Sequence, residues 1–278
     1  MAKNNKKTEQ LGINALTNML GDKSQLLEVR VDAAKCIVEI INETSDLSEK
    51  TKLIAPLLDA LKASKEPKLT LALIDIFSKL LASEIRLIDF GQIHLALAPL
   101  VLNADAGVRI AAARAVVTNF GKYNKEKKKS VLDTNIHHLE ESIANDVIKN
   151  ISNAVNKKLN SNGANNGEFT ESAWVISTLS LMLVNKTACD IRVSVRNVDV
   201  SAQVLLKIFE KTNSSAHKTE LLFALWQMKD YMATPTYALI SLLPDKLSLQ
   251  KLDSMFNLRQ SRVQAKGAGV GAPIKNKT

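Results

Sequence analysis

The feature that most constrains this chain is a sequence pattern that recurs about every forty residues. Each copy has a long apolar helical stretch, a turn, a short hydrophobic and basic step, and then an alanine-rich helical stretch. The step begins at Val29, at Pro67 and at Val108, so the copies are 38 and 41 residues apart. A period of this length is typical of helical hairpins that stack and bury their apolar faces against their neighbours. The sequence therefore predicts an all-α protein built from repeated helical pairs.

The composition agrees with an all-α fold. Hydrophobic residues make up 46% of the 278 residues but aromatic residues only 4%, so leucine, isoleucine, valine and alanine must form the core. Ten glycines and six prolines are few for the many tight turns of an all-β protein. The net charge of +9 is compatible with binding to nucleic acid, to anionic lipid or to an acidic protein, and it does not decide between them.

Two of the first helices, 53–61 and 95–102, each contain an internal proline, Pro56 and Pro99. A proline inside a helix removes a backbone hydrogen bond, so we expect a kink at both positions. Together with the step and the alanine-rich second helix, these features resemble the HEAT-repeat family of armadillo-like α-solenoids, and the match is strongest over residues 93–120. The resemblance implies an α-solenoid of about five to six HEAT-like helical hairpins.

The resemblance also implies a ladder of ion pairs. In the HEAT-repeat family, a turn aspartate and the arginine of the step tend to pair between neighbouring units. Asp105 with Arg30 or Arg109 would belong to such a ladder. In the second unit Lys68 stands where the family has an arginine, and the segment Glu66-Pro67-Lys68 departs from the pattern. We therefore expect the ladder to be incomplete.

The periodicity and the polar stretches divide the chain into five segments. These are a disordered N-terminus at 1–8, HEAT-like repeats at 9–159, a polar loop at 160–168, divergent C-terminal helical repeats with a cap at 169–262, and a disordered basic tail at 263–278. A fourth helical pair is predicted within 131–159, and the Asn- and Gly-rich loop after it is predicted to be the main internal boundary. Asp46 and Glu49 predict a helix N-cap, and Cys36 is predicted to lie in the core.

The sequence lacks the motifs of common catalytic and metal sites. It contains no P-loop pattern and no H-E-x-x-H, C-x-x-C or G-x-S-x-G. His137 and His138 are neighbours on a predicted helix and point in different directions, which is a poor arrangement for binding a metal ion. We therefore predict a protein that is not an enzyme, with no catalytic residues, no metal and no cofactor.

One spacing leaves an enzymatic alternative open. Trp226 and Asp230 lie one helical turn apart on the same face. They are similar to the tryptophan and aspartate of the HEAT-like alkylpurine DNA glycosylases, in which the carboxylate stabilises positive charge on the sugar as the base leaves. Trp174 would supply a further aromatic side chain. A tryptophan at helical spacing is more often part of the core, so we expect Trp226 to have a packing role.

The predicted function is a non-enzymatic scaffold or adaptor that binds a protein or peptide on the concave face of the solenoid. The second helices would line that face, and the candidate partner-binding residues on them are Lys35, Glu39, Arg114 and Asn119. The alternative is a nucleic-acid-binding protein that contacts phosphates through the basic turn at 122–129 and the basic tail.

The cysteines and the apolar stretches bear on the cellular environment. Cys36 and Cys189 are too far apart in sequence to suggest a disulfide framework, which favours a reducing compartment, and we expect the cytoplasm. We see neither a secretory signal nor a stretch of about 18 apolar residues that would span a membrane. We expect a monomer or a subunit of a larger complex.

Overall fold

The computed structural model describes residues 2–83, 85, 87–126, 133–160, 169–186, 191–229 and 232. These residues form ten α-helices and one 3₁₀ helix, with no strand among them, which confirms the all-α prediction. The chain divides into two compact units, Met1–Leu183 and Val184–Thr278. No helix in the described part of the chain combines the length and the apolar character needed to cross a membrane.

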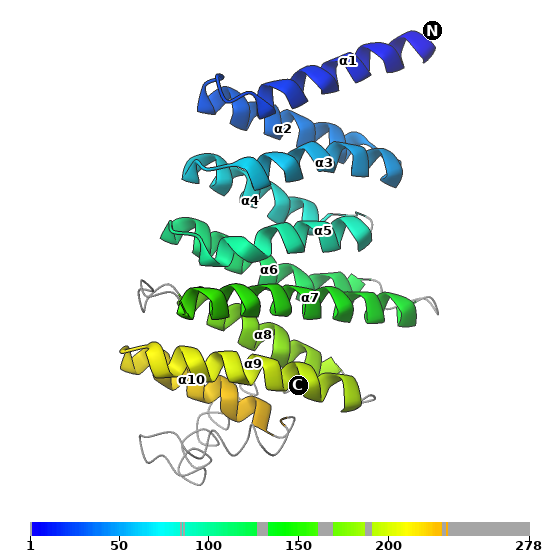
Figure 1. Cartoon of the computed structure of the whole chain (residues 1–278). Coiled ribbons are helices and arrows are strands. Elements are labelled where there is room, and N and C mark those ends of the chain that lie inside the picture. Colours follow the sequence, from blue (N-terminus) through cyan, green and yellow to red (C-terminus); the bar gives the residue numbers. More distant parts are fainter. Residues whose placement is uncertain are drawn as a thin grey trace, which may run out of the picture. The chain divides into compact units, whose positions relative to one another are not determined.

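The helices of the first unit alternate between two layers (Figure 1). The first-helix layer contains α1 (Ala2–Gly21), α3 (Leu47–Ala63), α5 (Leu87–Leu97) with the 3₁₀ helix η1 (Ala98–Leu102), and α7 (Asp133–Leu159). The second-helix layer contains α2 (Leu27–Glu43), α4 (Pro67–Leu81), α6 (Ala106–Glu126) and α8 (Thr170–Lys186). Within each layer the helices contact one another in chain order, from α1 through α3 and α5 to α7 and from α2 through α4 to α6, and an ion pair joins α6 to α8. Each second helix follows its first helix along the chain. In the second unit, α9 (Ile191–Lys211) packs against α10 (Ser215–Met228).

Local sequence signals set the ends of the helices. Asp46 is the N-cap of α3, because its side chain accepts hydrogen bonds from the backbone N–H groups of Ser48 at 2.7 Å and Glu49 at 3.4 Å, as predicted. Gly21 ends α1. At its other end α1 begins at Ala2, so residues 2–8, which we expected to be disordered, are helical. This stretch contains neither glycine nor proline, so nothing in it interrupts a helix.

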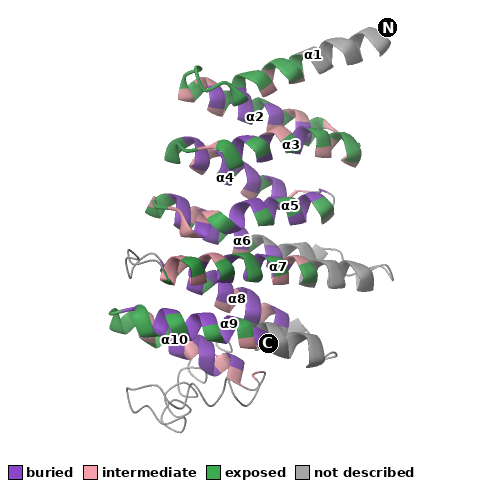
Figure 2. Ribbon diagram, in the orientation of Figure 1, coloured by how far each residue is buried: buried purple, intermediate pink, exposed green. Residues whose placement is uncertain are grey.

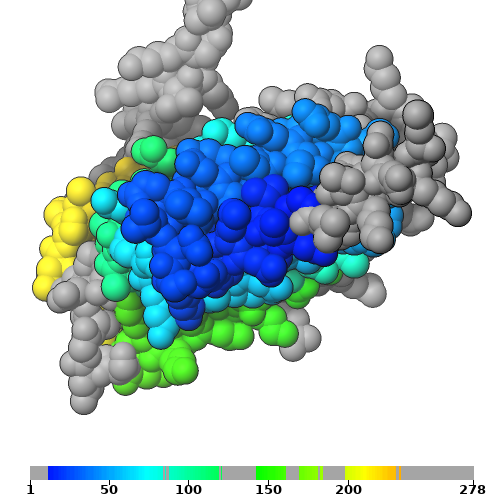
Figure 3. Space-filling model, turned by 90° about the horizontal axis from the view of Figure 1, so that it is seen from above, coloured from blue at the N-terminus to red at the C-terminus, as the bar shows by residue number. Residues whose placement is uncertain are grey.

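The core lies between the layers, and the exposed side chains lie on their outer faces (Figure 2). In α2 the buried face is formed by Arg30, Ala33, Ala34, Ile37 and Ile41, which follow the helical period. Cys36 is exposed, so the prediction that it lies in the core is wrong. It falls just outside the stripe that α1, α3 and α4 cover. Figure 3 views the N-terminal end of the unit, where α1 and α2 form much of the outer surface.

The two internal prolines have different consequences. Pro56 lies inside α3, which continues as an α-helix from Leu47 to Ala63. Pro99 lies in the first turn of η1, at the point where the α-helix α5 gives way to a 3₁₀ helix. The predicted equivalence in sequence is thus not an equivalence in backbone structure. A proline at the start of a new helical segment lacks only an N–H group that would have no partner there.

The helices within the first-helix layer are joined by polar contacts as well as by apolar packing. In the first-helix layer, the Thr51 hydroxyl of α3 donates a hydrogen bond to the Asp89 carboxylate of α5 at 2.6 Å. Gly91 of α5 faces Ile143 of α7 so closely that an added Cβ would lie 3.1 Å from the Ile143 Cδ1 atom. The absence of a side chain at Gly91 therefore lets α5 and α7 approach each other.

The fourth hairpin differs from the prediction. The described part of 131–159 is a single helix, α7, and the next helix along the chain is α8. The segment 160–168 therefore falls inside the first compact unit, and the boundary between the units follows Leu183 instead. The segment 133–159 contains neither glycine nor proline, so nothing in it ends the helix early. The predicted tail at 263–278 and most of the predicted cap lie outside the described residues.

Candidate functional site

The second helices share a buried position four residues into each helix. Arg30 occupies it in α2, Thr70 in α4 and Arg109 in α6, and all three side chains are buried. Lys68, which the sequence pattern aligned with the arginines, is exposed. The second repeat should therefore be aligned two residues later than predicted, with Thr70 and not Lys68 at the position of the arginines. Thr70 is the fourth residue of α4, just as the two arginines are the fourth residues of α2 and α6.

Arg30 links three helices. Its Nε donates a hydrogen bond to the Leu20 carbonyl at the end of α1 at 3.1 Å, and its Nη1 lies 2.8 Å from the Glu66 carboxylate at the start of α4. Glu66 belongs to the segment that we expected to interrupt the ladder. It is nevertheless the partner of Arg30, since it lies at the N-terminus of the next second helix.

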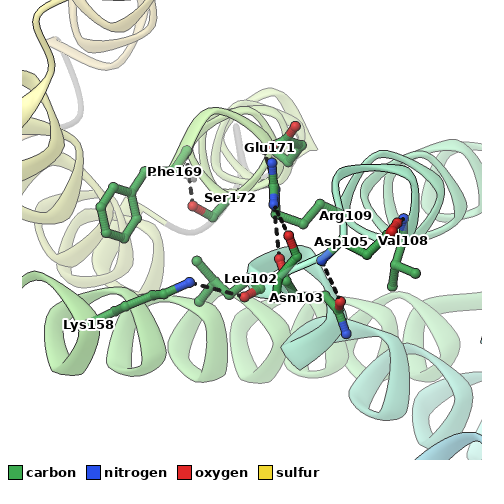
Figure 4. A network of polar contacts seen from close by, with 10 residues as sticks. Leu102, Asn103, Asp105, Val108, Arg109, Lys158, Phe169, Glu171 and Ser172 are labelled. Atoms are coloured by element: carbon green, nitrogen blue, oxygen red, sulfur yellow. Dashed lines mark hydrogen bonds and ion pairs between the residues drawn. The ribbon is translucent and has the colours of Figure 1, made fainter. Parts of the chain in front are cut away.

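Arg109 repeats this arrangement two pairs further along (Figure 4). Its Nη1 donates to the Asn103 and Ala104 carbonyls, both at 3.0 Å, and its Nε lies 3.3 Å from the Glu171 carboxylate in the first turn of α8. Asp105, the expected partner, caps α6 by accepting a hydrogen bond from the Val108 N–H at 2.9 Å. Each arginine thus pairs with a glutamate near the start of the next second helix that carries one, and not with the turn aspartate.

The buried fourth position, which is Ala173 in α8, sets which neighbouring side chain faces outward. The residue that follows the buried position is Val31 in α2, Leu71 in α4, Ile110 in α6 and Trp174 in α8, the fifth residue of each helix. We call these four residues the apolar row. Val31 and Leu71 are half-buried, whereas Ile110 is 42% exposed and Trp174 is 44% exposed. The Leu71 Cδ1 atom lies against the backbone of Gly107 in α6, which has no side chain to cover it.

The predicted partner-binding residues lie on the same layer. Lys35, Glu39 and Arg114 are exposed, while the side chain of Asn119 lies outside the described part of the structure. Lys35 and Arg114 occupy equivalent positions, one helical turn beyond the apolar row. The Asp32 carboxylate lies 2.9 Å from the Lys35 ammonium group and raises its pKa. The repeat pattern predicted these charged positions but not the apolar row, although each member of the row is the fifth residue of its second helix.

The structure also places the alternative enzymatic pair. Trp226 is only 7% exposed, and its ring lies against Phe223 and beneath the Lys229 ammonium group, which is 4.1 Å from the ring centroid. Asp230 lies outside the described residues. Stacking with a nucleotide base needs an open aromatic face. The buried, covered ring of Trp226 fits the packing role that we expected.

Other titratable groups do not gather into a site in the described part of the structure. No three of its His, Cys, Asp and Glu side chains lie close enough to hold a metal ion. The group with the largest pKa shift is His94 of α5, which is fully buried between the rings of Phe90 and Phe120. Burial lowers the pKa of His94 to about 4, although the backbone of Phe90 and Val116 offsets part of this effect.

The described residues thus present the apolar row and its neighbouring charges together on the exposed side of the second helices. The sequence matches no protein-family model and has no significant similarity to a curated protein.

Proposed function

We propose that the chain is a HEAT-like α-solenoid that acts as a non-enzymatic scaffold or adaptor and binds a protein or peptide across its second-helix layer. The observation that carries the proposal is the apolar row. Four successive second helices place an apolar side chain at the same position, and two of these side chains are large and exposed. Exposed tryptophan and isoleucine side chains in register on adjacent helices mark a binding surface more specifically than isolated apolar residues do.

The charged residues beside the apolar row would orient the bound partner. One helical turn from the row, the charges are Lys35 in α2, Asp75 in α4 and Arg114 in α6, so the sign alternates from helix to helix. One turn further on, Glu39 in α2 and Lys79 in α4 carry the opposite sign to the charge before them on the same helix. Tryptophan and arginine are enriched among the residues that dominate binding energy at interfaces. We therefore assign the largest share of the binding free energy to Trp174 and Ile110, and the choice of partner and its direction to the charges.

The spacing of the row indicates the conformation of the bound segment. Packed helices lie about 8–10 Å apart. A polyproline II chain advances about 9 Å for every three residues and returns its side chains to the same face. A partner segment that crosses the layer in this extended form would place one apolar side chain against each helix, at every third residue. A helical partner would instead reach the next member of the row only at every second turn, after about 11 Å, so half of the apolar turns on its contacting face would lie between the helices.

The experiment is affinity capture from cell lysate with the wild type, with the double variant Ile110→Ser/Trp174→Ser, and with Ile88→Ser. Ile88 is a matched control, because it is an exposed isoleucine of α5 in the other layer, at 59% exposure. Nuclease treatment separates bridging nucleic acid from direct protein contact. We expect protein partners that survive nuclease, are lost in the double variant and remain with Ile88→Ser. Capture that disappears with nuclease, or that the double variant retains, would refute the proposal.

A further inference from the structure

A groove of about 390 Å³ lies on the first-helix layer, between α1 and α3 and beside the end of α2. Its lining residues are Ile13, Asn14, Thr17, Ile40, Thr44, Glu49, Lys52, Leu53, Ala55, Pro56 and Asp59. The volume is within the range of small ligand pockets, about 300–1,000 Å³. Because many of the lining side chains are exposed, the groove is open to solvent and can admit a segment of a longer chain.

The groove has an apolar floor and an acidic edge. Leu53 is buried, and Ile13 and Ile40 are half-buried, so apolar surface lies at the bottom. Glu49 and Asp59, both exposed, lie nearly three helical turns apart on α3, and Lys52 is the only cation among the lining residues whose side chains the structure describes. Two carboxylates against one ammonium group give this described lining an excess negative charge, which favours a cationic occupant.

Pro56 leaves the backbone carbonyl of Lys52, on the same surface, able to accept a hydrogen bond from a ligand. In an α-helix the N–H of residue 56 would donate to the carbonyl of Lys52, but proline has no N–H. Lys52 and Pro56 both line the groove, so the Lys52 carbonyl lies on the groove side of α3 without its regular helical donor. A ligand that carries N–H donors can satisfy this carbonyl and the two carboxylates together.

We propose that this groove binds a segment of a partner protein in which an arginine or lysine is flanked by apolar side chains. The apolar side chains cover Ile13, Ile40 and Leu53, and the cation pairs with either the Glu49 or the Asp59 carboxylate, which are too far apart along α3 to share it. The site is separate from the apolar row, because the two surfaces belong to different helical layers. The proposal therefore does not depend on the proposed function.

The test uses three fluorescein-labelled twelve-residue peptides of equal leucine content, with arginine, glutamate or serine at the polar positions, and fluorescence polarisation as the readout. We expect the full-length protein to bind the arginine peptide at least about ten-fold more tightly than the glutamate peptide. Glu49→Gln and Asp59→Asn should each weaken binding of the arginine peptide by roughly two- to five-fold, since exposed ion pairs contribute up to about 1 kcal/mol.

Two further variants separate this groove from general attraction to a protein surface. Ala55→Trp fills the groove from an exposed position of α3, and Ala63→Trp is the matched control at an exposed position of the same helix outside the groove. We expect the first to abolish binding of the arginine peptide and the second to leave it unchanged. Ile110→Ser/Trp174→Ser should also leave it unchanged. Equal effects of the two tryptophan variants, or equal affinity for the arginine and glutamate peptides, would overturn the proposal.

Discussion

His94 should make the stability of the folded chain depend on pH in a direction and size that its surroundings set. The ring is fully buried between Phe90 and Phe120, and its Nδ1 lies 2.8 Å from the Phe90 carbonyl oxygen. Burial penalises the charged imidazolium, which lowers the pKa of His94 from 6.5 to about 4 in the folded state. In the unfolded chain the ring is solvated and keeps its ordinary pKa.

The sign follows from which state takes up the proton first. As the pH falls below 6.5, the unfolded state is protonated and stabilised, while the folded state stays neutral until about pH 4. The folded chain therefore loses stability through this window and loses no more from His94 below it. The difference between the two pKa values corresponds to about 3 kcal/mol in total, of which about 2 kcal/mol is lost by pH 5.

The assay is urea unfolding followed by circular dichroism at pH 7, 6 and 5, for the wild type and for His94→Leu. Leucine is similar in size to histidine but cannot be protonated. All other titratable groups are the same in both proteins, so their contributions to the pH dependence cancel in the comparison. We expect the free energy of unfolding to fall by about 2 kcal/mol more in the wild type than in the variant between pH 7 and pH 5. Parallel pH dependences in the two proteins would refute the assignment of His94 as a buried, neutral ring.

Three further predictions follow from the contacts of the first unit. Arg109→Met should lower the free energy of unfolding, measured with urea, by about 2–4 kcal/mol, and Arg30→Met should lower it by less. The reason is that the glutamate left without its partner is only 15% exposed for Arg109 but 50% exposed for Arg30. Equal losses in the two variants would contradict this. Ala112→Leu should cost about 1–3 kcal/mol by overpacking a fully buried position of α6, and an unchanged melting temperature would show that the contact is loose. Limited proteolysis should cut within 160–168, and the fragments should stay associated in size-exclusion chromatography, because the segment falls inside one compact unit. Fragments that separate would indicate a linker between domains.

The sequence by itself determined the features that depend on neighbouring residues along the chain. The all-α class, the end of α1 at Gly21 and the N-cap at Asp46 were predictable, because backbone conformation and capping depend on side chains within one or two helical turns. The burial of Ala112 and Ala113 was also visible in the repeat pattern, since small residues at that position let second helices approach. The exposure of Lys35, Glu39 and Arg114 followed from the same helical period.

The tertiary structure decided everything that depends on a neighbouring helix. The partner of Arg109 is 62 residues away, and no local signal distinguishes Glu171 from the nearer Asp105. Cys36 follows the apolar pattern of α2, but its exposure depends on how far α1, α3 and α4 extend over that helix. That the polar segment 160–168 falls inside one compact unit was hidden for the same reason, because a long polar connection has the same composition within a unit as between units. A helix specifies its own conformation and its apolar stripe, whereas the helices stacked on either side determine which part of that stripe is covered and which part remains free to bind.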